Sequence, residues 1–301
     1  MKNQLRGHIF AILTITIWSS TFIVSKIILE TLTPLQVLLM RYAIAVIFLS
    51  IIHPKFKRPD SWKEEILYLG IGGSLVAYFI FENSALQRTY SSNVSLIVAT
   101  IPLMTGLLSM VVFKTKFLTI RNILGFIIAY TGVAIIIING SRLEGVEPLG
   151  DFLAFGAAIM FAIYSVIMEK SKGSYHLIQK TRKVFIYGLL VLIVIVLIRG
   201  ESFSSIQMSL PLGASMLYLG ILASSLAFIM WNDAIGQLGP VRTNLYIYLV
   251  PVITTFFAWL ILKERITWLS ALGTVGILIG LYLSEQVEDE DQVTMKVENI
   301  L

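Results

Sequence analysis

The sequence predicts an all-α integral membrane protein with ten transmembrane helices, arranged as two inverted five-helix repeats. Three observations lead to this fold class: the composition, the long apolar runs, and a set of motifs that returns after half the chain. Hydrophobic residues make up 56% of the chain, charged residues make up 14%, and the mean hydropathy is +0.83. Soluble domains are nearer half apolar and a quarter charged.

Ten apolar runs approach the length of about 20 residues that a helix needs to cross a bilayer. The N-terminal run lacks a small-residue cleavage site, so we expect a retained span rather than a signal peptide. The third span should open with a capping box from Ser61 to Glu64. The seventh is expected to be short because Lys183 and Arg199 bound it, and their side chains can reach the interface. The predicted spans are residues 8–28, 34–52, 66–86, 90–112, 120–138, 149–169, 184–198, 211–231, 241–262 and 266–284.

The distribution of positive charge predicts the orientation of these spans. Sixteen lysines and arginines fall on the side of the N-terminus and five on the other side. Cytoplasmic loops carry the excess of positive charge, so both termini are predicted to be cytoplasmic, as an even number of spans requires. The expected location is the plasma membrane.

The two halves of the chain repeat one another. Pro102 matches Pro251 at an offset of 149 residues, and the stretch 83–86 (NSAL) matches 232–235 (NDAI) at the same offset. We therefore expect a first repeat over residues 1–143, a second over 144–284, and an acidic, disordered cytoplasmic tail over 285–301. A five-span unit that is duplicated must enter the membrane in the opposite sense the second time. Inverted repeats of this kind are typical of secondary transporters.

Several motifs, in order along the chain, resemble one transporter family. The first span carries the stretch 18–26 (WSSTFIVSK), the second opens with 33–35 (TPL) and carries Arg41, and the junction before the last span reads 262–267 (LKERIT). Over about residues 7–284 the chain resembles the EamA-type branch of the drug/metabolite transporter superfamily. The stretch 113–116 (FKTK) departs from the pattern, because it lacks the glutamate expected there. The resemblance implies an exporter of small metabolites such as amino acids or related compounds.

Polar stripes on the predicted helices indicate where a substrate could lie. In span nine, Asn244, Tyr248, Pro251 and Thr255 share one face, whereas the matching face of span four is small (Ser95, Ala99, Pro102 and Gly106). We expect span nine to contribute side chains to the cavity and span four to contribute room, although both faces could simply be packing surfaces. Pro102 and Pro251 are expected to mark the bending points of paired gating helices.

Other candidates lie on spans one, two, three and six. Trp18, near the middle of its span, is either packed core or a stacking wall; Thr21 shares its stripe. At an offset of 143 residues this stripe matches one on span six, where Phe161 aligns with Trp18 and Tyr164 aligns with Thr21. Charged residues inside spans are costly and indicate function: Glu82, one turn from Tyr78, could pair with Lys26 or Arg41, or bind an amine or a proton.

The sequence favours a transporter over other classes. It has no cysteine, and its three histidines lie at predicted membrane ends, so we expect no metal site and no cofactor. It lacks a GxxxxGK[ST] motif and a GxSxG motif, so we do not expect an enzyme. The expected partners are a small-molecule substrate and the lipid bilayer, and not nucleic acid. A monomer is sufficient to form the site, and a homodimer is a further possibility. The alternatives are a membrane-embedded helical scaffold and a lipid-acting membrane enzyme.

Overall fold

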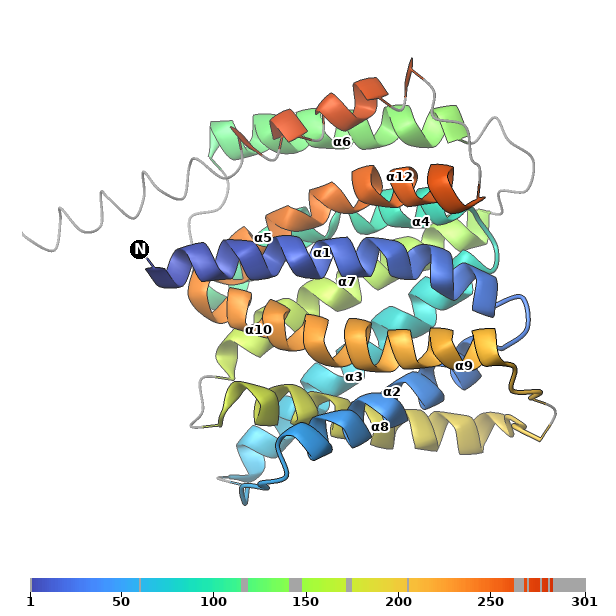
Figure 1. The fold of residues 1–301 in the computed structure, drawn as a ribbon. Helices are drawn as coiled ribbons and strands as arrows, with labels where there is room; N and C mark the ends of the chain where they lie inside the picture. The colour runs from blue at the N-terminus through green and yellow to red at the C-terminus, as the bar shows by residue number, and fades with distance from the viewer. Residues whose placement is uncertain are drawn as a thin grey trace, which may run out of the picture.

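The computed structural model describes residues 2–59, 61–114, 119–140, 148–171, 175–204, 206–262, 268–269, 271–276, 278–280 and 282–283. Every regular element in these ranges is helical, and Figure 1 shows most of the helices running along a common direction as one bundle. In chain order the elements are α1 (Lys2–Ile28), α2 (Pro34–Ile52), α3 (Trp62–Leu86), α4 (Ser91–Val98), α5 (Ile101–Phe113), α6 (Ile120–Gly140), α7 (Pro148–Lys170), α8 (Leu177–Arg199), α9 (Leu210–Leu217), the π-helix η1 (Tyr218–Leu226), α10 (Ala227–Leu238), α11 (Pro240–Leu245), the 3₁₀ turn η2 (Tyr246–Leu249) and α12 (Val250–Leu262).

Eight helical stretches in the described ranges are long and apolar enough to cross a membrane. Two shorter apolar helices, Ile120–Gly132 and Ala271–Gly280, coincide with the predicted fifth and tenth spans. The predicted acidic tail lies outside the described residues, as does the 262–267 junction after its first residue. The all-helical membrane fold that the composition predicts is therefore confirmed.

The predicted seventh span was wrong in length. Helix α8 covers 23 residues, because it begins at Leu177 rather than near Lys183. His176 caps its N-terminus in a capping box with Gln179. Lys183 does not end the helix, because its ammonium pairs with the carboxylate of Glu65 on α3. Polar side chains in the first turns of α8 thus have partners in the cap and on α3, so the helix includes these turns.

Two helical stretches are interrupted just before a proline. Pro102 is the second residue of α5, and Ala99 and Thr100 separate α5 from α4. Pro251 is the second residue of α12, and the 3₁₀ turn η2 separates α12 from α11. Proline is tolerated in the first turn of a helix, where its missing N–H would have had no partner. The two prolines that the repeat aligns therefore lie at equivalent breaks.

Small residues allow close helix contacts. Helix α3 packs against α7 and α8, and a Cβ placed on Gly72 would come within 2.8 Å of the Val184 carbonyl oxygen on α8. In Figure 1, α1 lies between α10 and α12, and α6 lies at one edge beside the last described helical segments. At that edge Gly276 approaches Gly132 of α6, as small residues at helix interfaces in membranes allow. Helix α1 of the first half thus packs mainly against α10 and α12 of the second half.

Candidate functional site

Aromatic rings fill the centre of the bundle. The Trp18 ring lies 4.8 Å from that of Phe228, 4.9 Å from that of Trp231 and 5.6 Å from that of Phe161, measured between centroids. Trp18 and Phe161 are equivalent positions of the two repeats at the front offset of 143 residues. One aligned pair of residues from α1 and α7 therefore makes a ring contact within the aromatic cluster.

Beside this cluster lies a small cavity that brings together five of the predicted residues: Trp18, Thr21, Arg41, Tyr78 and Glu82. Its remaining walls are Phe22, Phe79, Phe161 and Phe228. The cavity volume is about 20 Å³, which is little more than the space for one water molecule. Helices α1, α2 and α3 of the first half and α7 and α10 of the second half supply the walls, so the cavity lies where the two halves meet.

The cavity contains one cation and one carboxyl group, each fixed by neighbours. The Tyr78 hydroxyl donates to Glu82 Oε1 at 2.6 Å. Arg41 Nε donates to the Ser224 hydroxyl, and the guanidinium lies over the Phe79 ring, 4.1 Å from its centroid. Arg41 also interacts electrostatically with Glu82. Such a pair in an aromatic enclosure can bind a solute that carries both a negative and a positive group.

Two carbonyl groups of the π-helix η1 accept hydrogen bonds from side chains. The Trp18 indole donates to the Ala223 carbonyl at 3.0 Å, and the Ser225 hydroxyl donates to the carbonyl of Gly220, five residues earlier. Single π-turns often mark functional sites in helices. The sequence prediction for this span missed the π-helix and Ser224; the adjacent serines 224 and 225 inside an apolar run were the available signal.

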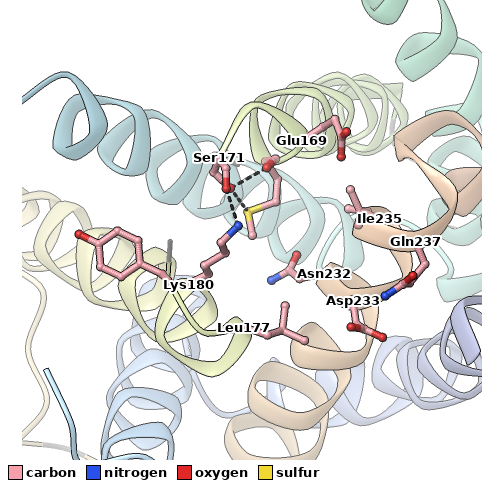
Figure 2. A pocket seen from close by; sticks show the side chains of 11 residues that line it. Glu169, Ser171, Leu177, Lys180, Asn232, Asp233, Ile235 and Gln237 are labelled. Atoms are coloured by element: carbon pink, nitrogen blue, oxygen red, sulfur yellow. Dashed lines mark hydrogen bonds between the residues drawn. The ribbon is translucent and has the colours of Figure 1, made fainter. Parts of the chain in front are cut away.

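A larger cavity of about 330 Å³ opens at the end of the bundle where α7 ends, α8 begins and α10 ends; we call it the vestibule. Figure 2 shows Lys180 reaching across it toward Ser171, with Asn232 and Asp233 on the facing helix. The Lys180 ammonium donates to the Ser171 carbonyl at 2.5 Å. Asp233 forms an ion pair with Arg6 at 3.0 Å. The vestibule is therefore polar and charged, in contrast to the aromatic centre.

Asn232 connects the vestibule with the aromatic centre. It lines the vestibule, accepts a hydrogen bond from the Tyr164 hydroxyl at 2.5 Å and donates to the Thr181 hydroxyl at 3.1 Å. The Tyr164 ring in turn lies 5.3 Å from that of Phe161, a wall of the central cavity. A chain of direct contacts through Tyr164 and Phe161 thus connects a wall of the vestibule with a wall of the central cavity. Asn232 aligns with Asn83 in the repeat, but it was not among the predicted site residues.

The predicted residues of span nine do not line the central cavity. Asn244 is buried and donates to Thr105 on α5 at 3.0 Å. Tyr248 lines a separate cavity with Phe126 and Tyr130 of α6. Thr255 is half-buried, and its neighbour Thr254 makes the contact with α1, to the Ser19 carbonyl.

Lys26 also lies away from the central cavity. Its ammonium donates to the Thr89 carbonyl at 3.0 Å and lies over the Tyr90 ring. Of the two cations that the sequence offered as partners for Glu82, only Arg41 lines the cavity with it. Within the described ranges, no three histidine, aspartate or glutamate side chains gather as metal ligands would.

Comparison with known proteins gives a consistent result. The sequence profile of the EamA-like transporter family matches residues 5–138 and 148–285. An "uncharacterized transporter" of Archaeoglobus fulgidus is 26% identical over 93% of this chain and 97% of its own length. A "probable amino-acid metabolite efflux pump" of Escherichia coli is 25% identical over 93% of this chain and 94% of its own.

Two further similarities complete the comparison. A "probable terminal-alkyne amino-acid exporter" of Streptantibioticus cattleyicolor is 24% identical, covering 89% of this chain and 91% of its own. One crystal structure matches 93% of this chain and 96% of its own with a TM-score of 0.70, at 19% identity. That likeness concerns the fold alone, whereas the names of the relatives support a membrane transporter.

Proposed function

Because this chain belongs to the EamA-like transporter family, we propose that it is a secondary active transporter that exports small metabolites, amino acids or related compounds, by alternating access. The observation that carries the proposal is the enclosed cavity at the meeting of the two halves, with Arg41 and Glu82 among its walls. A carboxylate and an amine on one small solute complement this pair. Two relatives are named for amino-acid compounds, which supports the same substrate class.

Transport requires that the cavity enlarge and open. A metabolite does not fit in about 20 Å³, so the structure corresponds in this proposal to a closed form. The vestibule on the side of the N-terminus is the proposed access route from the cytoplasm. Displacement of Tyr164 from Asn232 would join the vestibule to the cavity, and movement at the breaks before Pro102 and Pro251 would allow it. In inverted-repeat transporters, substrate sites lie at the repeat interface near the bilayer midplane.

We propose the membrane topology on the same basis. The eight long apolar helices, with Ile120–Gly132 and Ala271–Gly280, make ten spans, and the repeats cover residues 1–143 and 144–284, followed by a cytoplasmic tail at 285–301. Both termini are cytoplasmic because the N-terminal side carries the excess of positive charge. The contact of the equivalent residues Trp18 and Phe161 supports the pairing of the halves.

Flux in proteoliposomes tests the proposal. Purified protein is reconstituted and screened for uptake of labelled amino acids, amines and aromatic metabolites. A carrier gives saturable flux and counterflow, in which unlabelled solute inside the vesicle accelerates uptake of the labelled solute outside. Absence of flux across the panel would contradict transport and favour the scaffold alternative.

The variant Glu82→Gln tests the cavity. Loss of the carboxylate should lower transport at least about tenfold, equivalent to roughly 1.4 kcal/mol of lost interaction, whereas Glu30→Gln, at an exposed position, should leave it unchanged. Equal rates for both variants would exclude the central cavity as the substrate site.

A further inference from the structure

A cavity of about 560 Å³ lies where α8 ends, at the end of the bundle opposite to the vestibule; we call it the distal pocket. The start of α2 and the last turns of α3 and α8 form its walls. Among the described residues, two charged side chains line it, the cation Arg199 and the carboxylate Glu201. None of its described wall residues lines the vestibule or the central cavity, so a ligand bound here would be separate from the proposed transport route.

The end of α8 places both charges at the pocket. Arg199 is the last residue of α8, and Gly200 follows it as the C-cap in the left-handed conformation, with a φ of 62°. Glycine adopts this conformation without the strain that a side chain would cause. The N–H of Glu201 then donates back to the Val196 carbonyl at 3.2 Å. The chain therefore turns sharply, and the side chains on both sides of the glycine line one cavity.

The Glu201 carboxylate is held in place but keeps its charge. The hydroxyl of Thr33, the N-cap of α2, donates to Glu201 Oε1 at 2.5 Å. The side-chain amide of Gln36 donates to the Ser202 carbonyl at 2.7 Å and ties the same segment to α2. A carboxylate offers about four acceptor positions, and a neutral hydroxyl does not cancel its charge. Glu201 can therefore accept a further hydrogen bond from a cationic donor.

The Arg199 guanidinium is available to a ligand. Arg199 is exposed, and it makes no hydrogen bond, ion pair or ring contact with any residue in the described ranges. In particular it is not paired with Glu201, so the two charges do not satisfy each other. A guanidinium presents N–H donors in a fork that matches two oxygens of a phosphate. The distal pocket therefore offers one group that binds an anion and one that binds a cation.

The wall of the distal pocket toward the middle of α8 is apolar. Ile195 and Ile198 form it, together with Ile80 of α3, and Ile195 lies about one helical turn before Arg199. Ile198 is 79% exposed, and the exposed apolar face of α8 continues at Val194. Since α8 is long and apolar enough to cross a membrane, this face lies against acyl chains in a bilayer. The pocket is thus charged at the end of the span and apolar toward the hydrocarbon.

We propose that the distal pocket binds one phospholipid whose headgroup carries a phosphate and a primary ammonium, as in phosphatidylethanolamine. Arg199 holds the phosphate, Glu201 accepts a hydrogen bond from the ammonium, and an acyl chain lies along the apolar wall. A quaternary ammonium, as in phosphatidylcholine, has no N–H to donate to Glu201, so the primary ammonium binds more tightly. A free amino acid carries the same two charges, but only a lipid also covers the apolar wall with a hydrocarbon chain.

Native mass spectrometry of the purified full-length protein tests this site. The protein is titrated with phosphatidylethanolamine and with phosphatidylcholine of the same acyl chains. We expect one phosphatidylethanolamine to bind at least about fivefold more tightly than phosphatidylcholine, because only its ammonium donates a hydrogen bond to the carboxylate. Glu201→Gln should reduce this preference to less than about twofold. Arg199→Gln should weaken the binding of both lipids about fivefold, and Arg199→Lys should retain part of the affinity.

Two matched controls make the same changes of charge at exposed positions outside the walls of the distal pocket, Glu30→Gln just after α1 and Lys63→Gln at the start of α3. Both should leave the affinity and the preference unchanged. Equal binding of the two lipids to the wild-type protein would overturn the proposal, as would a preference that persists in Glu201→Gln. Equal losses in Arg199→Gln and Lys63→Gln would show a general surface-charge effect and overturn the site.

A third arm of the experiment separates a lipid from a free solute. Leucine carries a carboxylate, a primary ammonium and a short apolar side chain, but no acyl chain. We expect leucine at an equimolar concentration to leave the bound phosphatidylethanolamine in place. Displacement of the lipid by leucine would show a site for a free amino acid and overturn the assignment to a lipid.

Discussion

At matching positions of the two interrupted helices, the side chain before Pro102 is bonded within its own helix, whereas the side chain before Pro251 is bonded to other helices. In the first half, Ser95 donates within its own helix, to the Ser92 carbonyl at 2.7 Å. Its repeat partner Asn244 donates across to Thr105 on α5 and accepts from Ser165 on α7, at 3.0 and 3.4 Å. The hydroxyl of Tyr246, two residues on, shares a hydrogen bond with His8 on α1.

The two halves therefore share the position of the helix break, but they differ in the side-chain hydrogen bonds that connect the broken helix to its neighbours. A proline fixes where a helix is interrupted, but side-chain hydrogen bonds decide which neighbours hold the pieces. Helix contacts through small residues can slide, whereas an amide bonded to two helices resists sliding. We therefore expect the break before Pro102 to be the softer of the two and the break before Pro251 to act as an anchor.

Among the variants that test this difference, removal of the prolines should change the transport rate most. Pro102→Ala and Pro251→Ala each restore a backbone N–H and allow the helix to continue, which shifts the balance toward a straight helix by up to about 3 kcal/mol. Initial transport rates should fall at least about tenfold in each variant. The measurement is uptake into proteoliposomes, normalised to the amount of inserted protein.

Ile261, an exposed residue also on α12, offers a control position for Pro251→Ala. Ile261→Ala should change transport less than either proline variant, because it leaves the helix break in place. Rates equal to wild type in both proline variants would remove the proposal that the breaks are hinges. A fall in only one would identify the half that moves.

Substitution of the aligned asparagines Asn83 and Asn232 should change the stability in opposite directions. Asn232 is bonded to Tyr164 and Thr181, whereas neither amide atom of its repeat partner Asn83 has a hydrogen-bond partner among the described residues. Asn232→Ala should lower stability by about 1–2 kcal/mol, because the Tyr164 hydroxyl loses its acceptor. Asn83→Ala should be neutral or stabilising by up to about 1 kcal/mol, since a buried amide without partners is unfavourable.

Thermal unfolding in detergent measures both variants, and transport separates two explanations for Asn83. If Asn83 finds its partners in the opposite-facing form, Asn83→Ala should raise the unfolding temperature and slow transport together. An equal loss of stability in the two variants would show that Asn83 is bonded as Asn232 is and that the halves do not differ here.

Most of the fold could be predicted from the sequence because each span obeys one rule, that about 20 apolar residues cross a bilayer. The helical breaks were predicted at Pro102 and Pro251 because proline acts locally. The start of α8 was missed because the span was bounded at Lys183, whose ammonium pairs inside the helix with Glu65, a residue more than a hundred positions away. The repeat also predicted that Trp18 and the aligned Phe161 occupy equivalent places, although not that they touch.

The candidate site was less accessible to sequence reasoning. Charge inside a span brought Arg41 and Glu82 to attention, helical spacing placed Tyr78 one turn from Glu82, and the three residues line one cavity. The stripe of span nine was expected in the cavity, yet Asn244 faces α5 and α7 and Tyr248 faces α6. Periodicity says which residues share a face but not which neighbour that face meets. Asn232 and Ser224 are identified by their neighbours Tyr164 and Arg41, although the adjacent serines 224 and 225 gave a signal within their own span.

The smallest expected change is in stability, and it comes from substitutions at the aligned positions Asn244 and Ser95. Asn244→Ala removes bonds to two helices and should lower stability by about 1 kcal/mol, within the range measured for hydrogen bonds between membrane helices. For a protein of this size the unfolding temperature should then fall by about 2–4 °C. Ser95→Ala removes a bond within one helix and should change the temperature by less than about 1 °C. The double variant Asn244→Ala with Thr105→Ala measures the coupling: if it is no less stable than Asn244→Ala alone, the bond between the two broken helices is the interaction that was lost. Additive losses would instead mean that Asn244 is held mainly through Ser165 on α7, and the second break would then be anchored to that helix rather than to the first break.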